Sequence, residues 1–144
     1  MLIGGMAAAA LGSSRSTYDI DVAYSRTPRN LERMVSALTE LGATLRGAPA
    51  GIPFLLDAKT LERGLNFTFS TRFGALDILG EPAGAPRYEE LKGAATPTTI
   101  RGFTVQVASL DHLIAMKEAA GRPHDKATAA ELRAVADELR APGD

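Results

Sequence analysis

Residues 18–24, which read Y-D-I-D-V-A-Y, constrain the fold more than any other part of the chain. Polar and apolar residues alternate in this segment, and the alternation predicts a β-strand. Side chains two residues apart on a strand share a face, so Asp19 and Asp21 stand together. Ile20 and Val22 are then expected to face the core. Two carboxylates this close repel each other unless a cation lies between them, and Mg²⁺ accepts carboxylate oxygens together with water and phosphate. A solvated strand with an acidic outer face is the alternative, because short motifs often match by chance.

Asp77 is the expected third ligand of such a cation. It lies in A-L-D-I-L, among apolar residues of an expected interior strand. A buried aspartate without a partner is strongly unfavourable. A metal ion shared with Asp19 and Asp21 would supply that partner, and a salt bridge to Arg72 or to another nearby arginine is the alternative.

The rest of the chain mixes helices and strands without strict βαβ alternation, which favours an α+β fold with a mixed sheet covered by helices. The 144 residues suit one domain, with a sheet-bearing core over 1–107 and C-terminal helices over 108–144. Strands are expected at 2–3, 43–46, 65–70, 75–79, 98–101 and 103–107. Helices are expected at 6–11 after a Gly4-Gly5 turn, from Pro28 to Leu41, from Asp57 to Arg63, at 88–92, from Ser109 to Gly121 and at about 125–140.

Composition restricts the classes of function. The chain has no cysteine, which excludes disulfides, thiolate zinc sites and a cysteine nucleophile and fits a cytoplasmic protein. No apolar run approaches the ~20 residues that span a bilayer, and the apolar start lacks the basic region of a signal peptide. The formal net charge is −1, so any site for an anion must be local.

Two groups of residues suit a phosphate. Gly4 and Gly5 allow close approach of the backbone at the start of a helix, although an ordinary tight turn is the alternative. The polar loop that includes Ser14, Arg15 and Thr17 offers hydroxyl groups and a guanidinium, unless it is only a solvated connection.

A second basic group lies near the C-terminus. Lys117, Arg122 and Lys126 stand at the end of one expected helix, in the Gly121-Arg122-Pro123 break and at the start of the next helix. Pairing with Glu118 or plain solvation would explain each of them individually. His112 and His124 lack metal-ligand spacing, so neither is assigned a role.

Taken together, these features resemble the DNA polymerase β-like nucleotidyltransferase superfamily. Gly4-Gly5, the R-x-T-x-D-I-D block that starts at Arg15, and a later strand aspartate follow the order of its signature. Residues 117–125, K-E-A-A-G-R-P-H-D, are similar to a motif of bacterial members related to abortive-infection and toxin–antitoxin nucleotidyltransferases. The resemblance covers nearly the whole chain.

The resemblance implies roles for individual residues. Asp19, Asp21 and Asp77 would bind Mg²⁺ or Mn²⁺ and carry catalysis, and Asp77 would also help to deprotonate the acceptor. The residues implied in nucleotide binding are Gly4, Gly5, Ser14, Arg15, Thr17, Lys117 and Arg122, with Asp125 supporting that corner. Two positions depart from the pattern: Gly5 replaces a serine that contacts phosphate, and Thr128 stands where a second aspartate is usual.

The expected function is therefore transfer of a nucleoside monophosphate from an NTP to an acceptor hydroxyl of a tRNA, a protein or a small molecule. A toxin–antitoxin or defence role follows from the resemblance, with a homodimer or a cognate toxin or antitoxin as the expected protein partner and no membrane partner. An inactive module that binds nucleotide or a partner is the alternative. A third reading is a structural domain that dimerises through an apolar patch left by a missing N-terminal helix.

Overall fold

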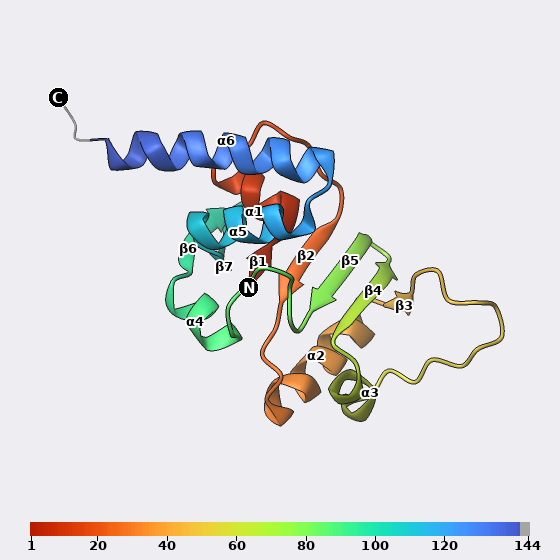
Figure 1. The fold of residues 1–144 in the computed structure, drawn as a ribbon. Coiled ribbons are helices and arrows are strands. Elements are labelled where there is room, and N and C mark those ends of the chain that lie inside the picture. Colours follow the sequence, from red (N-terminus) through yellow and green to blue (C-terminus); the bar gives the residue numbers. More distant parts are fainter. Residues whose placement is uncertain (142–144) are drawn as a thin grey trace.

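The computed structural model describes residues 1–141, and residues 142–144 at the end of the expected C-terminal helical part lie outside the description. Within residues 1–141, a seven-stranded mixed sheet is flanked by six helices (Figure 1). None of those helices combines the length and the apolar character needed to cross a bilayer. In chain order the elements are β1 (Leu2–Ile3), α1 (Gly4–Ala10), β2 (Ile20–Ala23), α2 (Pro28–Glu40), β3 (Thr44–Leu45), α3 (Ala58–Arg63), β4 (Asn66–Thr71), β5 (Gly74–Leu79), α4 (Tyr88–Gly93), β6 (Thr96–Ile100), β7 (Phe103–Val107), α5 (Leu110–Ala120) and α6 (Pro123–Arg140).

Strand β2 lies at the centre of the sheet, whose order is β3-β4-β5-β2-β1-β7-β6. It pairs in parallel with β5 and antiparallel with β1. The hairpins β4–β5 and β6–β7 extend the sheet on either side. This arrangement confirms the predicted α+β fold with a mixed sheet, and both hairpins were expected from the sequence.

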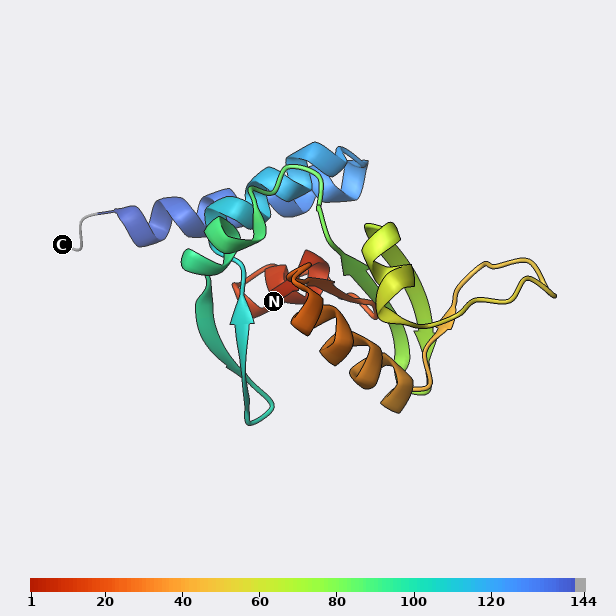
Figure 2. The same cartoon turned by 90° about the horizontal axis from the view of Figure 1, so that it is seen from below.

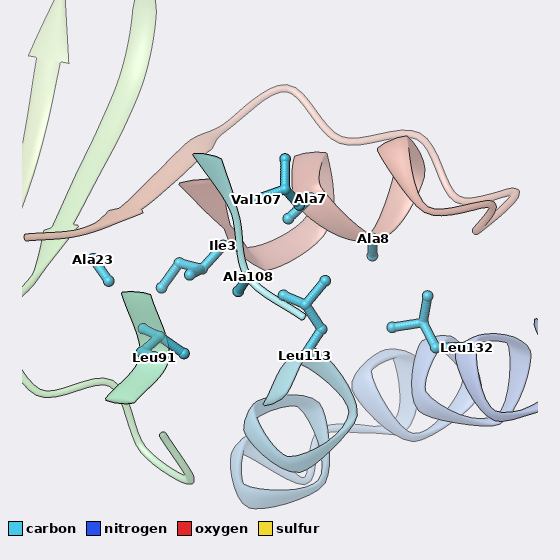
Figure 3. Packing of buried hydrophobic residues seen from close by; sticks show 9 residues of the cluster. All are labelled: Ile3, Ala7, Ala8, Ala23, Leu91, Val107, Ala108, Leu113 and Leu132. Carbon is cyan, nitrogen blue, oxygen red and sulfur yellow. The ribbon is translucent and has the colours of Figure 1, made fainter. Parts of the chain in front are cut away.

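Two hydrophobic cores cover opposite faces of the sheet. The first joins the sheet to α1, α4, α5 and α6, and Figure 3 shows Leu113 of α5 and Leu132 of α6 near Ala7 and Ala8 of α1. The second joins the sheet to α2 and α3 through Leu38, Leu61, Phe69 and Ile78. Figures 1 and 2 show α5 and α6 on one side of the strands and α2 on the other. The candidate site residues lie on the face that α5 and α6 cover, whereas α2 and α3 cover the other face.

Local signals in the sequence set several helix ends. Asp57 accepts a hydrogen bond from the Thr60 amide (2.7 Å) at the start of α3, and Ser109 caps α5 in the same way through the His112 amide. Gly42 and Gly121 follow α2 and α5 with φ values of +66° and +68°, a conformation that favours glycine. These four signals were all identified in the sequence.

The expected first strand and first helix are corrected in detail. Helix α1 begins at Gly4, so Gly4 and Gly5 form its first turn instead of preceding it. Strand β2 begins at Ile20 and not at residue 18, because the two-residue β1 pairs no further than Asp21 and β5 pairs no further than Ile20. Asp19 therefore precedes the strand.

The face expected to bury Ile20 is only partly covered. Val22 packs against the second core, but Ile20 is 42% exposed and lines an apolar groove with Leu2 and Phe103. Helices α2 and α3 cover only the β4–β5 half of this face and leave Ile20 uncovered. The prediction that Ile20 lies in the core is therefore wrong.

Leu132 and Leu139 of α6 provide a matched test of the first core, since Leu132 is fully buried and Leu139 is 76% exposed. We expect Leu132→Ala to lower the free energy of unfolding by about 2–5 kcal/mol, because it leaves a cavity. Leu139→Ala should change it by no more than about 0.5 kcal/mol. Urea denaturation followed by circular dichroism measures both, and equal losses would contradict the packing of α6.

Candidate active site

The three aspartates selected from the sequence line one pocket of about 350 Å³. Asp21 and Asp77 are paired across the parallel strands β2 and β5, so their Cα atoms stand at the same level of the sheet. Asp19 is two residues before Asp21, in the loop that leads into β2. Three carboxylates from two separate segments of the chain thus face one cavity.

Asp21 is seated against the start of α1. A Cβ atom added to Gly4 would overlap the Asp21 carboxylate, and Gly4 has a φ of +69°. The Gly5 amide also favours the charged form of this carboxylate. Glycine is therefore required at position 4 both by backbone conformation and by the close approach of Asp21. In this structure the Gly4-Gly5 backbone contacts a carboxylate of the site.

The charge around Asp21 favours its neutral form. Burial, followed by the charges of Asp77 and Asp19, raises the pKa of Asp21, while Lys117 and the Gly5 amide oppose the shift. A carboxylate that is half-buried beside two others gains most from a cation nearby. The oxygen donors present are those that Mg²⁺ and Mn²⁺ prefer, so their chemistry fits such an ion.

The three carboxylates are, however, not clustered around a single point. Within residues 1–141, no three acidic or histidine side chains stand close enough to hold a metal ion. Arg46 instead donates to Oδ1 of Asp77 over 2.6 Å, with both side chains partly exposed. Arg72, the arginine named in the sequence as the alternative partner, donates to the Glu40 carbonyl and not to Asp77. The alternative considered for Asp77, a salt bridge to Arg72 or to another nearby arginine, is therefore present, with Arg46 as the partner.

Arg46 reaches Asp77 because of the strand order. Its amide donates to the Thr68 carbonyl and continues the β3–β4 pairing. Thr68 in turn pairs with Asp77 across β4 and β5. The guanidinium therefore crosses one strand to reach the carboxylate on the next. Periodicity in the sequence shows which residues share a face but not which strands are neighbours, so Arg46 was missed.

An ion-pair cluster around Asp125 borders the pocket. Asp125 is completely buried at the start of α6. Its carboxylate accepts hydrogen bonds from Lys117 Nζ (3.0 Å) and from Arg122 Nε (2.6 Å). Lys117 and Arg122 also line the pocket beside Asp21 and Asp77. Pairing with Glu118, one alternative explanation considered for Lys117, is not observed, and Glu118 instead pairs with Arg133.

This cluster depends on the break between α5 and α6. Lys117 lies in the last turn of α5, and Gly121 with a φ of +68° reverses the chain. Arg122 then precedes Pro123, the first residue of α6. The glycine and proline that mark the break in the sequence thus bring the two cations onto one carboxylate. Lys126 does not line the pocket, and His124 and Thr128 do.

The polar loop before β2 is fixed to α6 by one side chain. Glu131 accepts hydrogen bonds from the Ser13 hydroxyl (2.7 Å), the Ser14 hydroxyl (2.9 Å) and the Ser14 amide (3.2 Å). These bonds lower the pKa of Glu131. Ser14 is thus engaged away from the pocket, whereas Arg15 and Thr17 line it. Glu131 was also missed, although its three-residue spacing from Thr128 on an expected helix could have indicated a shared face.

The comparisons with known proteins bear on this geometry. No family model matches the chain, and no curated protein matches it in sequence. Among solved structures it is similar to the lincomycin-bound crystal structure of the lincosamide antibiotic adenylyltransferase LnuA. The TM-score is 0.60 at 13% sequence identity, and the match covers 93% of this chain and 85% of that chain. The chain has a nucleotidyltransferase fold. This confirms the fold class expected from the sequence, while the roles of the site residues remain predictions.

We expect the stability of the chain to fall in acid because of Asp125. Burial raises the pKa of Asp125, but the hydrogen bonds and charges of Arg122 and Lys117 outweigh burial and lower it to about 2, from an ordinary value of 3.8. A depressed pKa in the folded state stabilises the protein above pH 4, and this contribution of about 1–2 kcal/mol disappears as the pH falls from 4 to 2. Urea denaturation at several pH values measures it.

Asp125→Asn isolates this effect. At pH 7 the variant should lose about 3–5 kcal/mol, because two cations lose a buried charged partner, and its stability should fall less between pH 4 and pH 2. Asp111→Asn is the matched control, since Asp111 and its partner Arg140 are both exposed; it should cost about 1 kcal/mol at most. Similar losses in both variants would contradict the description of the cluster.

Proposed function

We propose that the chain transfers a nucleoside monophosphate from an NTP to an acceptor hydroxyl and releases pyrophosphate. The observation that carries the proposal is the pairing of Asp21 with Asp77 at one level of neighbouring strands, with Asp19 in the same pocket. The fold shared with an adenylyltransferase supports it. The basic wall formed by Lys117 and Arg122 supplies charge complementary to a triphosphate.

In the proposed reaction, the acceptor oxygen attacks the α-phosphorus as the bond from that phosphorus to the bridging oxygen of the pyrophosphate breaks. Asp77 accepts the proton of the hydroxyl through the oxygen that Arg46 does not hold. Mg²⁺ or Mn²⁺ bound by Asp19, Asp21 and Asp77 would stabilise the charge on the attacking and leaving oxygens. Lys117 and Arg122 hold the departing pyrophosphate, with Asp125 keeping both cations in place.

A small molecule is the first class of acceptor to test. The structural neighbour is a lincosamide antibiotic adenylyltransferase, and the net charge of −1 provides no large basic surface for RNA. A tRNA end and a protein hydroxyl are the other classes. A role in a toxin–antitoxin or defence system is part of the proposal and rests on the motif at residues 117–125.

One observation favours the rival proposal of an inactive binding module. Asp77 is already paired with Arg46, and the carboxylates are not grouped around a metal position within residues 1–141. An inactive module would bind an NTP without consuming it. Nucleotide binding and turnover must therefore be measured separately.

Asp77→Asn should abolish transfer and preserve the fold. A neutral amide is a poor metal ligand and cannot accept the acceptor proton, so we expect the rate to fall by roughly 10³-fold or more. The assay follows α-labelled NTP into small-molecule, tRNA and protein acceptors, with Asp19→Asn as a second variant and Asp111→Asn as the control. Label transfer by a folded Asp19→Asn/Asp77→Asn double variant would overturn the mechanism.

Nucleotide should raise the melting temperature only when a divalent ion is present. Binding to the native state at about 100 times the dissociation constant adds about 2.7 kcal/mol. We expect this gain for wild type with Mg²⁺ and a non-hydrolysable NTP, and we expect Asp21→Asn to lose it. A shift of equal size in excess EDTA would show that the ion is not required. A shift with Mg²⁺ but no turnover with any acceptor would favour the binding module.

A further inference from the structure

A cavity of about 510 Å³ lies between the connection from β2 to α2 and the connection from β5 to α4. Strands β2 and β5 are parallel neighbours, and their last paired residues are Ala23 and Leu79. Helix α2 packs in the second core and α4 in the first, so the two connections leave the sheet toward opposite faces. Neighbouring parallel strands whose connections part in this way leave a crevice beyond their carboxyl ends, where ligands commonly bind.

This cavity is separate from the aspartate-lined pocket, and the two share no lining residue. Tyr24 lies three residues beyond Asp21, and Gly80 lies three residues beyond Asp77. Three residues of extended chain span about 10 Å. A ligand in this cavity would therefore not occupy the place of a metal ion or of a triphosphate.

Two arginines of the cavity, Arg26 and Arg87, form no ion pair with a carboxylate of residues 1–141. Arg26 is half-buried and belongs to the connection after β2, whereas Arg87 is exposed and precedes α4. Nη2 of Arg26 donates to the Glu62 carbonyl over 2.6 Å, while its Nη1 is buried without a hydrogen-bond partner among the described residues. Partial burial of an uncompensated charge is unfavourable, so the two guanidinium groups favour an anion between them.

Packing holds Arg26 at the wall of the cavity. Its side chain passes over Gly80, because a Cβ atom added at position 80 would lie 3.1 Å from Arg26 Cδ and 3.4 Å from the Tyr24 hydroxyl oxygen. The Tyr24 hydroxyl donates to the Leu65 carbonyl over 2.9 Å. Burial raises the pKa of Tyr24, and the charge of Arg26 opposes that rise. A guanidinium held in this way loses little conformational entropy when a ligand binds.

The remaining side chains of the cavity indicate what accompanies the anion. Four of them offer flat or rigid apolar surface: Tyr24, Pro82, Pro86 and Tyr88. An aromatic ring packs well on such surfaces. Glu81 also lines the cavity, and its charge repels a dianion such as a phosphate monoester more strongly than a monoanion. These features together favour a singly charged carboxylate on an aromatic ring.

We propose that this cavity binds a small aromatic carboxylate, with the carboxylate group between Arg26 and Arg87. Each guanidinium then gains a charged acceptor, and the ring packs against the tyrosine and proline side chains. The inference does not rest on the proposed function, because neither the aspartates of the other pocket nor the basic residues beside them take part.

Benzoate is the probe, with benzamide as its neutral counterpart and phenyl phosphate as the dianion. Titration into the isotope-labelled protein, followed by amide chemical shifts, gives both the dissociation constant and the position of the ligand. We expect benzoate to bind with a dissociation constant of about 1 mM, as suits so small a ligand. It should shift amides between residues 24 and 27 and between residues 80 and 88. Benzamide and phenyl phosphate should each bind at least about fivefold more weakly than benzoate.

Variants with opposite expected effects test the charges. Arg26→Gln and Arg87→Gln should each weaken benzoate binding by about fivefold to tenfold, because each removes a cation beside the carboxylate. Glu81→Gln should strengthen it by about twofold, because it removes a like charge. Arg33→Gln is the matched control, since Arg33 is exposed on α2 and does not line the cavity, and it should leave the affinity unchanged. If Arg26→Gln does not fold, the exposed Arg87 decides the matter.

Three outcomes would overturn the inference. The first is the absence of any saturable shift at millimolar benzoate. The second is binding of benzamide or phenyl phosphate as tight as that of benzoate, which would show that the cavity does not select a carboxylate. The third is wild-type affinity for benzoate in Arg87→Gln, or shifts that lie outside the two connections. None of these outcomes bears on nucleotide transfer, which the label assay tests separately.

Discussion

Repulsion between carboxylates is the constraint around which this pocket is arranged. Parallel pairing sets Asp21 and Asp77 at one level of neighbouring strands, and the charge of Asp77 raises the pKa of Asp21. The structure relieves this repulsion from both sides. Arg46 pairs with Asp77, and Lys117 lowers the pKa of Asp21 that burial raises. Arg46 and Lys117 thus partly offset the negative charge of Asp77 and Asp21.

Lys117 and Arg122 are oriented by their hydrogen bonds to the buried carboxylate of Asp125. Asp125 has no exposed surface and accepts bonds from both Lys117 and Arg122, so its charge is fully compensated where it is buried. Neither cation forms an ion pair with Asp21 within residues 1–141. The pocket thus contains three carboxylates on its wall, Asp19, Asp21 and Asp77, while the buried carboxylate of Asp125 lies behind Lys117 and Arg122 and binds both of them. Burial and neighbouring carboxylates raise the pKa of Asp21, whereas Arg122 and Lys117 lower that of Asp125.

The sequence predicted those features that depend on local patterns. Four short-range signals each placed a site residue on the correct element: the cap at Ser109, the glycine at position 121, the alternation in β2 and the apolar residues of β5. The sequence could not predict contacts that depend on strand order. Arg46 contacts Asp77 only because β3, β4 and β5 are consecutive in the sheet. The burial of Ile20 was mispredicted for a similar reason, since alternation shows which face a side chain takes but not whether a helix covers that face.

Helix α6 carries much of the pocket although it lies outside the sheet. Asp125 at its start orients two cations, Glu131 one and a half turns later fixes the polar loop, and Leu132 anchors the helix to the first core. Local opening of one helix would release the basic wall and the loop together. The amide protons of α6 should consequently exchange with solvent in step with that of Ser14, which donates to Glu131, whereas the amides of β2 and β5 exchange only on global unfolding. The pocket is then a cooperative unit whose assembly can be lost and regained without unfolding the sheet.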